Sequence, residues 1–167
     1  MKIFKRIGII ALLAFLTISL VGCGKEEKKE EKNVEANVSG TLEEIMTKLY
    51  DGLADDEKPM GLENQVLNED NIEWFAGTKD LEYKEGLGAE SMIGSIAHSV
   101  VLFRVKDGVD VEAFKNKIKD SINPRKWICV GVEPDDVIIK SKGDLVVLIL
   151  VENSTTREAI DKNFGEL

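Results

Sequence analysis

The sequence contains few of the residues on which metal-dependent and nucleophilic catalysis rely. Its 167 residues include two cysteines and one histidine, and aromatic residues make up 6% of the chain. One histidine and one free cysteine cannot form a histidine-rich or cysteine-rich zinc site. A glycosidase needs paired carboxylates, normally in a cleft with aromatic platforms for the sugar, and aromatic residues are scarce. We therefore expect no metal, no cofactor and no enzymatic activity.

Basic residues are also in the minority. The chain has 22 lysine and arginine residues against 31 aspartate and glutamate residues, a formal net charge of −9. Residues 1–22 hold three of the basic residues and none of the acidic ones, so residues 23–167 have a formal net charge of −12. Nucleic-acid binding requires a basic surface, and anionic lipid repels an acidic domain. The composition therefore argues against nucleic acid as a partner and against direct adsorption to a membrane.

The N-terminus has the organisation of a secretory signal. A short basic segment precedes an apolar stretch, which ends in the string Leu20-Val21-Gly22-Cys23. This ending resembles the lipobox of bacterial lipoproteins, in which the cysteine is lipidated and the chain is cut before it. The alternative is an uncleaved membrane anchor, but a spanning helix needs about 20 apolar residues and this stretch is shorter. We expect the mature protein to be held on the extracytoplasmic face of the cell membrane by a lipid on Cys23.

Three regions follow from this assignment. Residues 1–22 are the predicted signal peptide, residues 23–40 the lipidated cysteine with a charged flexible tether, and residues 41–167 a single globular domain. Lysine and glutamate balance within the tether, which is typical of a solvated spacer. Because Cys23 carries the lipid, Cys129 has no partner for an intrachain disulfide. The domain must therefore be stabilised by its hydrophobic core.

Hydrophobic periodicity predicts an α+β domain. Capping boxes at Thr41/Glu44 and Thr155/Glu158, and a cap at Asp110, mark the starts of three helices. The predicted helices cover residues 41–57, 70–76, 110–122 and 155–164, and the predicted strands cover residues 100–105, 127–132, 137–139 and 145–151. We expect a mainly antiparallel sheet with helices packed on one face. A ferredoxin-like, split βαβ arrangement is compatible with the C-terminal half. Residues 78–95 contain several glycines and predict no regular element.

Several segments of the domain resemble a known family. They are Met92–Leu102, Arg104–Gly108, Val111-Glu112, Pro124–Val130 and Gly143-Asp144. Together they are similar to an uncharacterised domain family of lipoproteins from anaerobic Gram-positive bacteria, and the string Lys126-Trp127-Ile128-Cys129-Val130 is the most specific part. The resemblance covers residues 41–164. That family has no assigned activity or catalytic residues, so the resemblance implies a lipoprotein and leaves the function open.

The single histidine, His98, suggests a nucleophilic triad because Ser95 and Ser99 lie near it in sequence. On a strand, however, both serines would point to the face opposite His98. The sequence also has no Gly-x-Ser-x-Gly motif. We therefore interpret His98 as an exposed or edge-strand histidine.

Cys129 alternates with Trp127 and Gly131 on one face of a predicted strand. A buried thiol in this position behaves as a small hydrophobic group, and we favour that interpretation. The alternative is a reactive thiol, which needs positive charge nearby; Arg125 and Lys126 could supply it.

Clusters of acidic residues could in principle bind calcium, which needs only oxygen ligands. The clusters lie at residues 55–57, 68–71 and 133–136, and none follows the calcium-loop pattern. We interpret them as solvated turns and helix ends. Gly86, Gly88 and Gly94 do not match a dinucleotide-binding motif, and we interpret them as a loose loop.

The best candidates for a partner-binding surface are aromatic. Trp127 is either a core anchor or, if the edge formed by Arg125, Lys126 and Trp127 is exposed, part of a partner-binding patch. Trp74 and Phe75 form a second candidate with the same two interpretations. We therefore expect a non-catalytic domain that binds a protein or another component of the cell envelope. The alternatives are a small-solute-binding lipoprotein and a cell-wall hydrolase that uses acidic residues.

Overall fold

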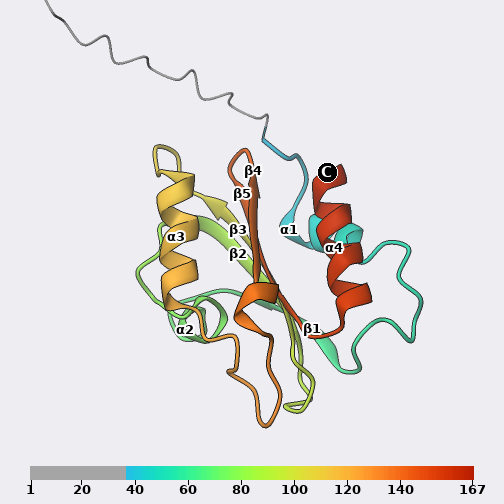
Figure 1. Ribbon diagram of the computed structural model, residues 1–167. Coiled ribbons are helices and arrows are strands. Elements are labelled where there is room, and N and C mark those ends of the chain that lie inside the picture. The colour runs from blue at the N-terminus through green and yellow to red at the C-terminus, as the bar shows by residue number, and fades with distance from the viewer. Residues whose placement is uncertain (1–36) are drawn as a thin grey trace, which may run out of the picture. The chain divides into compact units, whose positions relative to one another are not determined.

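The computed structural model of the protein describes residues 37–167. The predicted signal peptide, Cys23 and most of the tether lie outside the described residues. The elements are α1 (Leu42–Leu49), β1 (Leu62–Val66), α2 (Ile72–Ala76), β2 (Tyr83–Ser91), β3 (His98–Val105), α3 (Val111–Ser121), the 3-10 turn η1 (Pro134–Asp136), β4 (Ile138–Lys142), β5 (Leu145–Val151) and α4 (Ser154–Glu166) (Figure 1). No helix within the described part of the chain is long and apolar enough to cross a membrane.

The five strands form one antiparallel sheet in the order β1-β2-β3-β5-β4. The predicted fold class, α+β with a mainly antiparallel sheet, is therefore confirmed. The two central strands, β3 and β5, are apolar at successive positions, and every residue of β5 is buried. Such a run indicates a strand that is covered on both faces.

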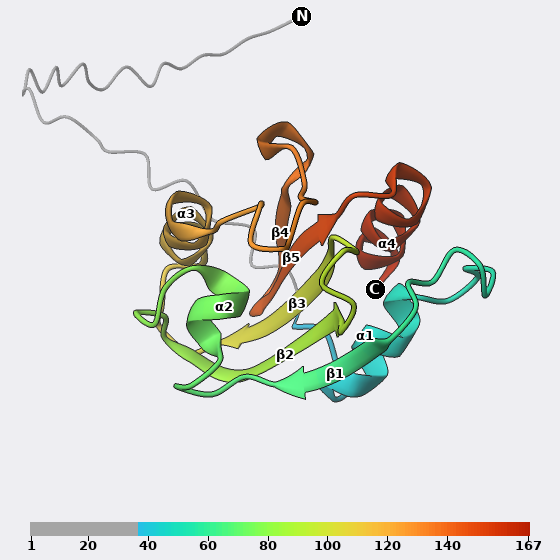
Figure 2. The same ribbon diagram turned by 90° about the horizontal axis from the view of Figure 1, so that it is seen from below.

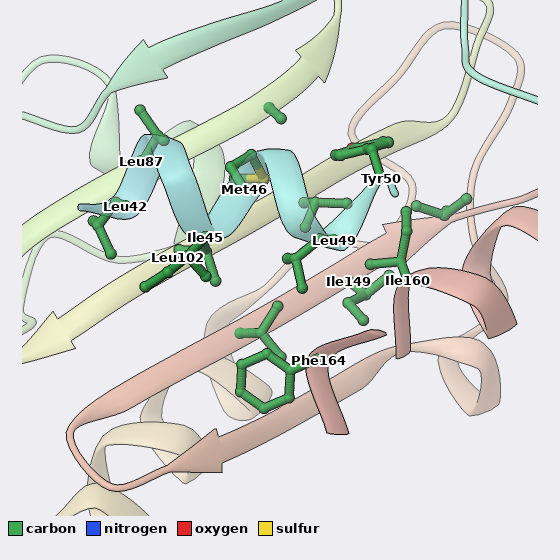
Figure 3. Close-up of a cluster of buried hydrophobic side chains, with 14 of the residues drawn as sticks. Leu42, Ile45, Met46, Leu49, Tyr50, Leu87, Leu102, Ile149, Ile160 and Phe164 are labelled. Atoms are coloured by element: carbon green, nitrogen blue, oxygen red, sulfur yellow. The ribbon is translucent and has the colours of Figure 1, made fainter. Parts of the chain in front are cut away.

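Helices cover both faces of the sheet, which corrects the expectation that they pack on one face (Figure 2). On one face, α1 and α4 contribute Ile45, Leu49, Ile160 and Phe164 to a core over β2, β3 and β5 (Figure 3). On the other face, α2 and α3 contribute the second core. The reason is the composition of β3 and β5, because apolar side chains on both faces of a strand must both be removed from water.

The C-terminal half contains the expected split βαβ arrangement. Both β3 and β4 pair with β5 in antiparallel orientation, so β3 and β4 are parallel to each other with β5 between them. The connection between them contains α3. Because α4 lies on the face opposite α3, the likeness to a ferredoxin-like fold is limited to this unit.

Local capping signals position the helices. Thr41 and Glu44 form the predicted capping box of α1, and Asp110 caps α3 by accepting from two backbone N–H groups. At α4 the prediction is corrected: Asn153, and not Thr155, is the N-cap residue. The first helix also ends at Leu49, earlier than expected.

The predicted strand at residues 127–132 is wrong. Cys129 has a φ of 62°, in the left-handed region, so the backbone cannot continue as a strand. Residues 123–133 instead form a loop, closed by a hydrogen bond from the N–H of Val132 to the carbonyl of Pro124 (2.9 Å). The apolar run is explained by Trp127 and Val132, which are buried in the second core.

Residues 37–40, the last part of the predicted tether, contact the domain. Val38 packs against the α1/α4 core, and the carbonyl of Gly40 accepts a hydrogen bond from Nη2 of Arg104 (2.7 Å). The side chain of Asn37 accepts from the N–H of Asp144 in the β4–β5 turn (3.2 Å). The chain therefore enters the domain at the end of the sheet that holds this turn.

Candidate functional site

Strand β2 provides the floor of the candidate site. Gly86, Gly88 and Glu90 alternate along it and face α2. A Cβ at Gly88 would lie 2.4 Å from Cε1 of Phe75, so the missing side chain is what allows α2 to lie close to the sheet. This close approach places Trp74 beside Glu90.

Glu90 is a buried carboxylate that three side chains contact. It is 4% exposed. Its Oε2 accepts a hydrogen bond from Nε1 of Trp74 (2.7 Å), and its Oε1 accepts one from Nε1 of Trp127 (2.9 Å). Nζ of Lys126 lies 3.2 Å from Oε1 and forms an ion pair. The charge on this carboxylate is therefore both paired and hydrogen-bonded, as burial requires.

Lys126 is enclosed by aromatic rings. Its Nζ lies 4.9 Å from the ring centroids of Trp74 and Phe75 and 5.0 Å from that of Trp127, distances typical of cation–π contacts. It also donates to the Oγ of Ser99 (3.3 Å) and to the carbonyl of Trp74 (3.2 Å). We call Trp74, Phe75, Glu90, Ser99 and Trp127, which surround this ammonium group, the lysine box.

The environment changes the protonation of Lys126. Burial removes the ammonium group from water and lowers its pKa to about 8, although the neighbouring charge of Glu90 opposes the shift. The side chain is 4% exposed. Lys126 is thus charged at neutral pH but loses its proton at a lower pH than a solvated lysine does.

A hollow of about 410 Å³ opens beside the lysine box. Its rim carries apolar side chains that are exposed to solvent: Trp74 is 49%, Met92 57% and Ile128 74% exposed. The charged residues that line it are Asp70, Glu90 and Lys126. The hollow combines an apolar rim with a charged floor, which is the usual composition of a binding pocket.

The structure brings together four of the five residues predicted to bind a partner. Phe75 and Trp127 are buried, Trp74 is partly exposed, and Lys126 lies between their rings. Arg125 is the exception, because its side chain is directed to Glu133, with which it forms an exposed ion pair. Trp127 is therefore a core residue that also takes part in the site.

Sequence reasoning missed Glu90. Its only signal is the alternation of Gly86, Gly88 and Glu90, which would place the carboxylate on the same face as two close-packing glycines. That signal is visible only if residues 83–91 are recognised as a strand, and the sequence predicted no element there. The prediction of a loose loop at the glycines is wrong for Gly86 and Gly88, which lie in β2.

His98 is buried, which corrects the prediction of an exposed or edge-strand histidine. It begins β3, a central strand, and its Nε2 lies 2.7 Å from the hydroxyl of Tyr50 in a shared hydrogen bond. Burial lowers the pKa of His98 to about 4 and raises that of Tyr50. The prediction that His98 and Ser99 face opposite sides of the sheet is confirmed, because Tyr50 lies in the α1/α4 core and Lys126 on the α2 side.

Ser99 and Lys126 form a pair of the type that acts as nucleophile and base in some acyl-transfer enzymes. Ser99 is completely buried (0% exposed) beneath the lysine. The same ammonium group is also ion-paired with Glu90. While Lys126 occupies this position, a substrate carbonyl has no access to the Ser99 hydroxyl.

Cys129 is exposed, so the favoured prediction of a buried thiol is wrong. Its left-handed backbone turns the side chain out of the core. The charge of Lys126 is directed into the lysine box, and that of Arg125 is paired with Glu133. Within residues 37–167, no group of three or more histidine, cysteine, aspartate or glutamate residues could hold a metal ion.

Comparison with known proteins adds no relative. No protein-family model matches the chain, and neither the curated proteins nor the solved structures give a significant match.

Proposed function

We propose that the protein is a lipid-anchored, extracytoplasmic lipoprotein whose domain binds a protein or another component of the cell envelope. The observation that carries the proposal is the half-exposed indole of Trp74, held by the buried carboxylate of Glu90 at the rim of the hollow. Tryptophans fixed in this way are typical of binding hot spots because little conformational entropy is lost when a partner covers them. A nucleophilic role for Ser99 has less support, since its hydroxyl is buried beneath Lys126.

Exposed apolar side chains lie on several neighbouring loops near the hollow. The N–H of Met92 donates to the carbonyl of Gly61 (2.9 Å), and that of Ile128 donates to the carbonyl of Gly94 (3.0 Å). Met60, Met92, Ile93 and Ile128 are therefore exposed side chains of neighbouring segments. We call this surface, together with Trp74, the apolar end of the domain. A grouped set of exposed apolar residues in an acidic protein indicates an interaction surface.

The apolar end lies away from the point where the tether reaches the domain. Glu90 pairs with Ser99 near the start of β3, whereas Gly40 contacts Arg104 near its end. In Figure 1 the β4–β5 turn and the β2–β3 connection lie at opposite ends of the sheet. Residues 37–40 therefore leave the apolar end uncovered.

A small-solute-binding lipoprotein is the second candidate. It is favoured by the hollow, whose volume of about 410 Å³ falls in the usual range of ligand pockets, roughly 300–1,000 Å³. The two candidates use the same surface and differ in whether the hollow or its apolar rim provides most of the contact.

Site-specific photo-cross-linking in cells that produce the protein tests the proposal. A photoreactive residue at Met92 or Ile128 should give a defined adduct with an envelope component. The matched control is Val66, which is 65% exposed. It pairs with Leu87, a residue of the α1/α4 core, so its side chain lies on the face of the sheet opposite to the hollow. We expect no adduct from Val66, and Ile128→Asp should abolish the adduct formed at Met92 without unfolding the domain.

Two cross-linking results would contradict the proposal. If Met92 and Ile128 give no adduct, or give the same adducts as Val66, the apolar end is not a partner-binding surface. The Cys23→Ala variant serves as a mislocalised control, since a partner in the envelope should be reached only by the anchored protein.

A further inference from the structure

The lysine box contains a complete recognition set for an ammonium group. Three oxygen atoms lie within 3.3 Å of Nζ of Lys126, from Glu90, Ser99 and the carbonyl of Trp74. A primary ammonium group has three N–H donors, so their number matches. Three aromatic rings enclose the remaining surface of the cation.

The box does not depend on Lys126 for its shape. Glu90 is held by hydrogen bonds from two indole N–H groups, and it pairs directly with Ser99 across β2 and β3. Phe75 is fixed in the second core by its contact with Gly88. The acceptors and rings would therefore keep their positions if the lysine side chain moved into the hollow.

Lys126 is suited to leave the box. It lies in the 123–133 loop, which has neither helix nor strand, and its side chain lines the hollow. Its lowered pKa shows that the loss of hydration outweighs the attraction of Glu90. Burial therefore penalises the charged form of Lys126, and it would penalise the ammonium group of a ligand equally. A ligand displaces Lys126 through the contacts that its apolar body gains at the rim.

We propose that the lysine box is a receptor for a primary ammonium group on an apolar body, and that Lys126 occupies it as a built-in competitor. This inference rests on the proposed binding function and names the chemistry that the site recognises. The apolar body of the ligand would contact Trp74, Met92 and Ile128 at the rim. The ammonium group belongs either to a free small amine or to a lysine side chain of a protein partner, and the recognition chemistry is the same for both.

Intrinsic fluorescence gives a direct measurement because Trp74 and Trp127 are the two tryptophans of the protein. In the Lys126→Ala variant, n-butylammonium should change the fluorescence saturably, with binding tighter than in the wild type by about tenfold or more. The neutral analogue n-butanol should give no comparable change. Lys84→Ala is the matched control, since Lys84 forms an exposed ion pair with Asp107 outside the hollow; its affinity should equal that of the wild type.

The wild-type protein provides a second measurement that does not depend on the folding of a variant. Raising the pH from about 6.5 to about 9.5 neutralises Lys126 but leaves an alkylammonium ion of ordinary pKa largely charged. Asp70 and Glu90 are the carboxylates that line the hollow. Displacement moves Lys126 from the box, where it is neutral at pH 9.5, into water, where a pKa of about 10.4 keeps it charged, so binding is coupled to the uptake of a proton. Binding of n-butylammonium in its charged form should therefore weaken as the pH rises.

Several results would overturn the inference. Equal binding of n-butanol and n-butylammonium to Lys126→Ala would exclude an ammonium receptor, and so would unchanged binding after Glu90→Gln in that background. A wild-type affinity for the charged ligand that does not fall at the higher pH would exclude Lys126 as a competitor. Competition between n-butylammonium and N-acetyl-lysine methylamide distinguishes the two sources, because a site for a protein side chain should bind the lysine derivative more tightly. If n-butylammonium does not bind but cross-linking at Met92 persists, the ammonium inference fails and the proposed function stands.

Discussion

Lys126 and His98 are ionisable side chains enclosed on opposite faces of the same sheet. Burial lowers the pKa of both, to about 8 for Lys126 and to about 4 for His98. Lys126 keeps its charge at neutral pH, and Glu90 lies beside it. His98 is instead neutral at that pH, with the hydroxyl of Tyr50 at its Nε2. The two groups differ in charge at neutral pH mainly because the ordinary pKa of lysine lies about four units above that of histidine, and Glu90 raises the pKa of Lys126 further.

The state of His98 predicts a pH dependence of stability. In the unfolded chain a histidine has an ordinary pKa of about 6.5, so as the pH falls the unfolded state binds a proton before the folded state does. Stability attributable to His98 is therefore lost between about pH 6.5 and about pH 4, by about 3 kcal/mol in total. Urea unfolding of the wild type and of His98→Gln across this range measures it.

The comparison isolates the histidine from the many carboxylates, which titrate in both proteins. We expect the wild type to lose more stability on acidification than His98→Gln does. Parallel stability curves for the two proteins would show that His98 is protonated equally in the folded and unfolded states.

At the scale of elements, α2 shows how a marginal helix positions the site. It has five residues, Ile72–Ala76, too few to be stable in isolation. Packing holds it: Phe75 lies over Gly88 of β2, and Gly77 ends the helix against the end of α3. The position of Trp74 therefore depends on contacts that α2 makes with two other elements.

Gly77 and Gly52 provide a matched test of that packing, because both have a φ of +77°. A Cβ at Gly77 would lie 2.1 Å from the carbonyl oxygen of Ser121, whereas a Cβ at Gly52 would have nothing within 4 Å. Gly52→Ala should cost about 1 kcal/mol from backbone strain alone. Gly77→Ala should cost about 1–3 kcal/mol more, because α2 and α3 must move apart.

Chemical denaturation of the two variants checks this prediction, and tryptophan fluorescence reports whether the lysine box is disturbed. Equal losses of unfolding free energy in the two variants would show that α2 and α3 move apart at Gly77 without an energetic penalty. A fluorescence change in Gly52→Ala would contradict the assignment of Gly52 to open space.

At the scale of the whole molecule, the domain is organised along the sheet. Residues 37–40 contact it at the end that holds the β4–β5 turn, and the apolar end lies at the other. The chain therefore reaches the domain at the end opposite to the proposed binding surface.

The anchoring itself rests on Cys23 and stays a prediction. Cys23→Ala removes the thiol that the lipid would modify, so the variant should be released from the membrane or keep its signal peptide. Membrane fractionation with intact-mass measurement checks both results. A Cys23→Ala protein that is membrane-bound and correctly cut would contradict lipid attachment at this residue.

Much of the fold follows from local patterns in the sequence. The buried run of β5 and the capping residues Thr41 and Asp110 are signals within short segments, and the structure has the corresponding elements. Residue type alone also selected Trp74 and Trp127, because large aromatic groups with a polar N–H are suited to binding. These features need no knowledge of distant contacts.

The remaining features depend on contacts between residues far apart in the chain. The alternation of Gly86, Gly88 and Glu90 has meaning only once residues 83–91 are known to be a strand. Glu90 becomes the centre of the site because Trp127, 37 residues away, donates to it. The apolar run at residues 127–132 has the composition of a strand, yet the left-handed Cys129 makes it a loop. Thus the sequence by itself determined the fold class and the aromatic candidates, which local patterns specify. Only the tertiary structure decided which side chains share the lysine box, because that depends on how the loop and α2 pack against β2.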